Sequence, residues 1–144
     1  MNEENRDVRQ REDHPQRLPG CRGQGRRRLD RALTEDGTFT DESIPYTYRG
    51  PDELGLTVEV YAKAFPDMHR ELHKFYLAGD VVIVQLSLQG THLGPLELPS
   101  GTVPPTGKRM DAPCCDVFEL VGGKIKRFDC YPEGTVIAKQ LGLA

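Results

Sequence analysis

The stretch VVIVQLSLQ, residues 81–89, decides how this chain folds. It follows the turn pair Gly79-Asp80 and stops at Gly90, and its length and apolar content predict a long β-strand. Side chains alternate between the two faces of a strand. One face of this strand carries only apolar residues, namely Val82, Val84, Leu86 and Leu88. We therefore expect that face to pack in the core.

Two further strands are predicted at residues 110–120 and 124–131. They are joined by a tight turn at residues 121–123, where two adjacent glycines favour a hairpin. With the strand at 81–89 they would form an antiparallel array. In such an array one face can line a pocket while the other packs or meets solvent.

Two aspartates stand out on the predicted hairpin. Asp116 shares a strand face that is otherwise apolar, and Asp129 lies on a mixed face with Arg127. A carboxylate on an apolar face is costly unless it is paired, hydrogen-bonded or protonated, and such groups concentrate at functional sites. Each aspartate could instead simply bond a neighbouring backbone group or an arginine. The residues alone leave both interpretations open.

The length and composition of the chain indicate how it is divided into domains. With 144 residues and a formal net charge of −3, the chain is expected to form one domain over residues 29–144. Residues 1–28 are polar, arginine-rich and broken by proline and glycine, which predicts a poorly ordered segment. No aromatic residues interleave with these arginines, so we expect a solvated tail and no nucleic-acid partner.

No apolar run approaches the ~20 residues of a membrane helix, and the N-terminus lacks the apolar core of a signal peptide. We therefore expect a soluble cytoplasmic protein without a membrane partner. Its cysteines are Cys21, Cys114, Cys115 and Cys130, with no Cys-x-x-Cys spacing. Cys114 and Cys115 are adjacent and would point to opposite faces of a strand, so we predict reduced thiols and no metal site.

A helix is predicted from Pro51 to Phe65, with proline in its first turn and Pro66 at its end. Residues 67–76 can be read as helix or as strand. A helix would place His69 and His73 one turn apart, the spacing of a zinc pair, whereas a strand would hold them too far apart for one ion.

Several short motifs, taken in order, resemble the SnoaL-like polyketide cyclase family. They are AFPD (64–67), AGDVV (78–82), GTHLG (90–94), PPTGK (104–108) and DVF (116–118). The resemblance extends from about residue 33 to residue 143 and includes GKI (123–125) and QLGL (140–143). It implies an α+β fold, the nuclear-transport-factor-two-like cone, in which a curved antiparallel sheet wraps around helices and encloses a pocket. It also implies that residues 68–76 form a strand.

The resemblance implies roles for four residues. Asp129 falls where the cyclases carry their acid/base aspartate, pointing into the cone. Asp41 falls near the base of the related ketosteroid isomerases, and Asp116 near the isomerase aspartate that stays protonated and donates to an enolate. His92, in the GTHLG turn, would border the pocket or alternatively cap the backbone. The pocket walls are expected to include Gln85, Ser87, Phe118 and Tyr131.

These roles predict acid/base catalysis without a metal or cofactor, as an aldol-type cyclisation or an isomerisation. The partner would be a small apolar or polycyclic ligand that carries a carbonyl group, and we expect a homodimer. The alternative is a non-catalytic module that uses the same cone to bind a ligand or to dimerise. One departure is clear: the isomerases take a tyrosine donor from their first helix, and this chain has no tyrosine before Tyr46.

Overall fold

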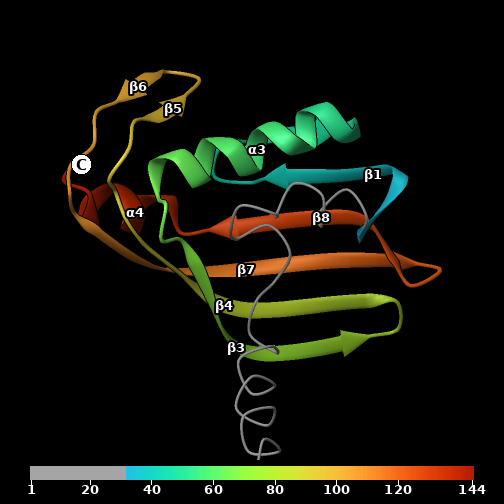
Figure 1. The fold of residues 1–144 in the computed structure, drawn as a ribbon. Coiled ribbons are helices and arrows are strands. Elements are labelled where there is room, and N and C mark those ends of the chain that lie inside the picture. The colour runs from blue at the N-terminus through green and yellow to red at the C-terminus, as the bar shows by residue number, and fades with distance from the viewer. Residues whose placement is uncertain (1–31) are drawn as a thin grey trace, which may run out of the picture.

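The computed structural model describes residues 32–144, so the expectation for residues 1–28 lies outside the described part of the chain. Figure 1 shows the arrangement of the elements. In chain order they are β1 (Leu33–Asp41), β2 (Tyr46–Arg49), α3 (Gly50–Ala64), β3 (His69–Ala78), β4 (Val81–Thr91), β5 (Leu96–Leu98), β6 (Gly101–Val103), β7 (Arg109–Val121), β8 (Lys124–Pro132) and α4 (Gly134–Gln140). Among these described residues, no helix is long and apolar enough to cross a bilayer.

Six strands form one curved sheet in the order β2-β1-β8-β7-β4-β3. The strands predicted at 81–89, 110–120 and 124–131 are confirmed as β4, β7 and β8. All neighbours pair antiparallel except β1 and β8, which run parallel. The sheet is therefore mixed rather than wholly antiparallel, because β1 runs parallel to its neighbour β8. The rest of the fold is the expected α+β cone.

The β7–β8 hairpin turns at Gly122 and Gly123, whose φ angles are 57° and 76°. Two successive residues with positive φ are the signature of a type I′ turn, whose twist matches that of the strands. Residues other than glycine rarely adopt this backbone conformation, which explains why two glycines occupy the turn.

The core lies on the inner face of the sheet. Val84, Leu86 and Leu88 of β4 are buried, as the alternation predicted. The helices α3 and α4 and the small β5–β6 hairpin gather over this face, with α3 running alongside β1 (Figure 1). An interior is thus enclosed between the sheet and these three elements.

The helix predicted from Pro51 to Phe65 is confirmed as α3, with Pro51 in its first turn and its last residue, Ala64, one position earlier than predicted. The next segment is the extended strand β3, which confirms the strand implied for residues 68–76 and excludes the helical zinc pair. The end of α3 is tied to the GTHLG turn, because the backbone N–H of Gly94 donates to the carbonyl of Ala64. A Cβ at Gly94 would lie 2.0 Å from the carbonyl oxygen of Lys63, so only glycine allows this approach.

Candidate active-site pocket

A cavity of about 710 Å³ lies between the inner face of the sheet and the elements that cover it. Most of its wall is apolar, with contributions from Phe39, Val58, Phe65, Met68, Leu88, Leu96, Leu98, Met110, Phe128, Ile137 and Leu141. Asp41, Tyr61 and Arg70 are prominent polar groups on the same wall. A mainly apolar cavity with a few convergent polar groups is the usual form of a small-molecule site.

Asp41 is the last residue of β1 and is 3% exposed. Its Oδ1 accepts hydrogen bonds from the backbone N–H of Ser43 at 2.9 Å and from the Ser43 hydroxyl at 2.6 Å. Its Oδ2 accepts a hydrogen bond from the hydroxyl of Tyr61 at 2.7 Å. The chain turns sharply after the strand, which brings Ser43 back onto the carboxylate in an Asx-type turn. These donors compensate the cost of burying the carboxylate inside the protein.

Tyr61 lies on α3, is half-buried and lines the cavity. Burial raises the pKa of Tyr61 well above its usual value, and the charge of Asp41 and the hydrogen bond to it raise this pKa further. The phenol therefore keeps its proton and acts as a donor. Sequence analysis did not identify Tyr61 as a candidate site residue. The available signal was its hydroxyl, since a buried tyrosine needs a polar partner.

Arg70 of β3 forms an ion pair with Asp116 of β7. The Asp116 side chain is 0% exposed and that of Arg70 is 14% exposed. The guanidinium carbon of Arg70 also lies 5.7 Å from the centre of the Phe128 ring. Because Arg70 lines the cavity, the pair fixes a positive charge on the pocket wall.

Both oxygens of Asp116 accept hydrogen bonds, Oδ2 from Arg70 and Oδ1 from the thiol of Cys114 at 3.5 Å. This arrangement differs from the expected protonated aspartate that donates to an enolate. Asp116 instead holds Arg70, which becomes the donor that faces the cavity. Sequence analysis missed Arg70 because the segment around it could be read as helix or strand.

The register of the sheet places the carboxylates of Asp41 and Asp116 at the same height along the strands. Asp41 of β1 and Asp116 of β7 are both paired with Cys130 of β8, which lies between them. Neighbouring strands are about 4.8 Å apart, so the two aspartate backbones are on the order of 10 Å apart. Asp41 thus lines the cavity directly. Asp116 lies behind Arg70 and holds that side chain at the cavity wall.

The expectation that Asp129 points into the cone is wrong. Its neighbours Phe128 and Cys130 line the cavity, and strand alternation directs Asp129 to the opposite face. There its Oδ2 accepts a hydrogen bond from Nε of Arg127 at 2.8 Å, and the charge of Asp129 raises the pKa of Arg127. Its buried Oδ1 has no hydrogen-bond partner among residues 32–144.

Three of the residues expected to line the pocket also lie on the outer face of the sheet, so these expectations are wrong. Gln85 and Ser87 alternate with the buried residues of β4, and Ser87 contacts Nε2 of His73 at 2.7 Å. Tyr131 is exposed next to Cys130. Phe118, by contrast, is buried on the inner face. It stacks on the cavity residue Phe128 with ring centres 4.4 Å apart, and so lies one layer behind the wall.

His92 is fully buried and holds the GTHLG turn in place. Its Nδ1 accepts a hydrogen bond from the backbone N–H of Thr106 at 3.2 Å and lies 3.0 Å from the Thr106 hydroxyl. Its ring stacks on Phe65 at 5.3 Å. These contacts favour the backbone-capping interpretation, and Phe65 rather than His92 forms the cavity wall.

Solved structures with the same fold include a proposed SnoaL-like polyketide cyclase from Jannaschia sp. CCS1. It is 22% identical with a TM-score of 0.76, and the match covers 87% of this chain and 83% of that one. A protein with a ketosteroid isomerase-like fold from Catenulispora acidiphila, solved in complex with trimethylamine, is 21% identical with a TM-score of 0.70, and the match covers 85% of both chains. IdmH from Streptomyces antibioticus, a proposed polyketide cyclase, is 21% identical with a TM-score of 0.66, covering 81% of this chain and 86% of that one.

These likenesses show the ketosteroid isomerase-like fold. Comparison with curated proteins found no match. The profile of the SnoaL-like domain matches residues 22–128, about three quarters of the chain. The protein therefore belongs to the SnoaL-like family.

Proposed function

We propose that this protein is an acid/base enzyme that acts on an apolar small molecule with a carbonyl group. The observation that carries the proposal is the placement of Asp41 and Arg70 on the wall of one largely apolar cavity. A base and a cationic donor are what proton removal beside a carbonyl needs. The names of the structural relatives and the family support this class of chemistry.

In the proposed reaction Asp41 takes a proton from the carbon next to the carbonyl group. The electron pair of the broken C–H bond moves to the carbonyl oxygen and gives an enolate, while Asp41 becomes neutral. The charge of Arg70 stabilises the enolate oxygen, and it does so more strongly than in water because the walls are apolar. Tyr61 fixes the orientation of Asp41 through its hydrogen bond.

Two outcomes are then open to the enolate. In an isomerisation, Asp41 returns its proton to a different carbon. In an aldol-type cyclisation, the enolate carbon attacks a second carbonyl group, and the new alkoxide takes the proton from Asp41. Both use the same groups of the chain, so the substrate decides between them. A polycyclic or ring-forming ketone suits the size and apolar walls of the cavity.

The proposal can be tested by hydrogen–deuterium exchange at carbon, which requires only the first step. Apolar ketones that bind the protein are incubated with it in D₂O, and deuterium uptake beside the carbonyl is followed by NMR. We expect Asp41→Asn to slow the exchange by about 10²–10⁴-fold, the usual contribution of a general base. The matched control is Asp80→Asn, which changes an exposed aspartate in the β3–β4 turn.

Binding of the same ketones is measured in parallel by calorimetry. Ligand binding without protein-dependent exchange, or exchange unaffected by Asp41→Asn, would contradict the enzyme and favour the ligand-binding module. Asp41→Glu keeps the carboxylate, so partial recovery in that variant separates loss of the base from loss of the fold.

The homodimer stays a prediction. The strand β3 is an edge of the sheet and exposes Phe75, Tyr76 and Leu77. Exposed apolar residues on an edge strand are often covered by a partner. Light scattering of the parent and of Leu77→Lys would test it, since a dimer built on this edge should dissociate in the variant.

A further inference from the structure

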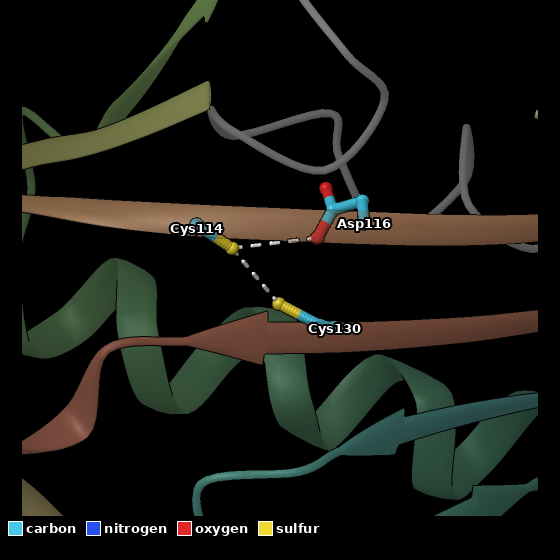
Figure 2. A group of neighbouring side chains, drawn as sticks. All are labelled: Cys114, Asp116 and Cys130. Atoms are coloured by element: carbon cyan, nitrogen blue, oxygen red, sulfur yellow. Dashed lines mark hydrogen bonds between the residues drawn. The ribbon is translucent and has the colours of Figure 1, made fainter. Parts of the chain in front are cut away.

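We propose a metal site for a thiophilic divalent cation, formed by Cys114, Asp116 and Cys130. Figure 2 shows the two thiols and the carboxylate converging from the neighbouring strands β7 and β8. One potential ligand atom from each residue lies within 4.8 Å of the other two. Sequence analysis compared Cys114 only with its neighbour Cys115 and did not find this group, because the pairing of β7 with β8 creates it.

The distances suit tetrahedral coordination. Zn–S bonds of about 2.3 Å and Zn–O bonds of about 2.0–2.2 Å at a tetrahedral angle place two sulfurs about 3.8 Å apart and a sulfur and an oxygen about 3.6 Å apart. The Sγ atoms of Cys114 and Cys130 are 3.6 Å apart, and Sγ of Cys114 is 3.5 Å from Oδ1 of Asp116. A Zn²⁺ ion would therefore need little rearrangement of these side chains.

The charges also suit a divalent cation. Two thiolates and one carboxylate carry three negative charges, of which the ion neutralises two. The remaining negative charge lies beside Arg70, which already contacts Asp116. The site would thus be electrically balanced in a buried environment, where an unbalanced charge is costly.

The position of Cys130 gives the ion access to the cavity. Cys130 lines the cavity wall, while Cys114 and Asp116 lie behind it. Three protein ligands leave a fourth tetrahedral position, which is the pattern of a zinc site that accepts an exogenous ligand. An oxygen from water or from a molecule in the cavity would complete the coordination.

The decisive experiment is a Co²⁺ titration of the reduced full-length chain, followed by absorption. All variants carry Cys21→Ser, so that Cys115 is the one cysteine left outside the proposed site. We expect one equivalent to produce a thiolate-to-cobalt charge-transfer band and the intense visible bands of tetrahedral Co²⁺, with Zn²⁺ displacing both. Because no substrate is present, the result does not depend on the acid/base proposal.

Cys114→Ser and Cys130→Ser should each weaken Co²⁺ binding at least 10-fold and reduce the charge-transfer band. The matched control is Cys115→Ser, which changes the adjacent thiol on the opposite strand face and should leave the titration unchanged. X-ray absorption of the zinc-loaded parent should show two sulfur ligands. The site is disproved if the parent gives no charge-transfer band, if both serine variants retain it, or if zinc has no sulfur neighbours.

Discussion

The hydroxyl of Tyr61 donates a 2.7 Å hydrogen bond to Oδ2 of Asp41 and so joins helix α3 to the end of strand β1 inside the cavity. The family resemblance implied a tyrosine donor on a first helix, but no tyrosine precedes Tyr46 in this chain. In this chain α3 supplies a tyrosine to the aspartate of the pocket, and Ser43 supplies the other two donors. The carboxylate is thereby oriented by Ser43, in the turn that follows β1, and by Tyr61 of α3.

Tyr61→Phe should lower the free energy of unfolding by about 1.5–3 kcal/mol, the usual contribution of a hydrogen bond to a charged group. Asp41 would keep its two hydrogen bonds from Ser43, so the fold should survive. Urea denaturation measures the change. Tyr76→Phe is the control, because Tyr76 is exposed on β3 and its hydroxyl makes only a 3.4 Å contact with Gln85. An equal loss in both variants would contradict the importance of the Tyr61 bond.

The stability of the protein should fall at alkaline pH partly because of Tyr61. Burial and Asp41 raise the pKa of Tyr61 in the folded state, so the folded chain holds the phenolic proton more tightly than the unfolded chain does. Its contribution is complete below the unfolded pKa of about 10 and is lost as pH rises through the folded pKa. Phenolate absorbance should show a late-titrating tyrosine in the parent that is missing from Tyr61→Phe. Titration of all tyrosines near pH 10 would contradict this.

Arg70→Met should lower the free energy of unfolding by about 3–5 kcal/mol, because it leaves the fully buried Asp116 without its cationic partner. Adding Asp116→Asn should recover part of this loss, since the unpaired charge is then removed. Thermal and urea denaturation would measure both. Lys63→Met is the control, because the Lys63–Glu97 pair is more than half exposed and should be worth less than about 1 kcal/mol.

Asp129→Asn should leave ketone exchange within about 2-fold of the parent, a change well below the 10²–10⁴-fold contribution of a general base. The reason is that Asp129 contacts Arg127 on the outer face of the sheet, whereas Asp41 faces the cavity. The exchange assay in D₂O applies directly. A loss as large as that of Asp41→Asn would return Asp129 to the role that the family resemblance implied.

Gly94→Ala should destabilise the protein by about 1–3 kcal/mol, the range for overpacking at a tight contact. The new Cβ would lie 2.0 Å from the carbonyl oxygen of Lys63, and backbone atoms would have to move. Because Lys63 lies on the last turn of α3, NMR shifts should spread toward Tyr61. Ser100→Ala, in the exposed β5–β6 turn, is the control and should change neither. Unchanged stability in Gly94→Ala would show that the turn can move freely.

The sequence by itself indicated the family and the positions of α3, β4, β7 and β8. The apolar run 81–89 predicted β4, the glycine pair predicted the β7–β8 hairpin, and Pro51 and Pro66 marked the limits of α3. These are local effects, since strand alternation, turn conformation and the missing N–H of proline act within a few residues. Alternation also separated the two faces of β4 and identified the apolar face as core.

The tertiary structure decided which of these faces encloses the cavity and which residues meet there. Alternation places Asp129 and Cys130 on opposite faces but does not say which one α3 covers. The pairing of Arg70 with Asp116 joins residues 46 positions apart, and that of Tyr61 with Asp41 joins residues 20 positions apart. Cys114 and Cys130 likewise meet only through the register of β7 and β8. Such contacts depend on strand order and helix placement, which arise from the packing of the whole core.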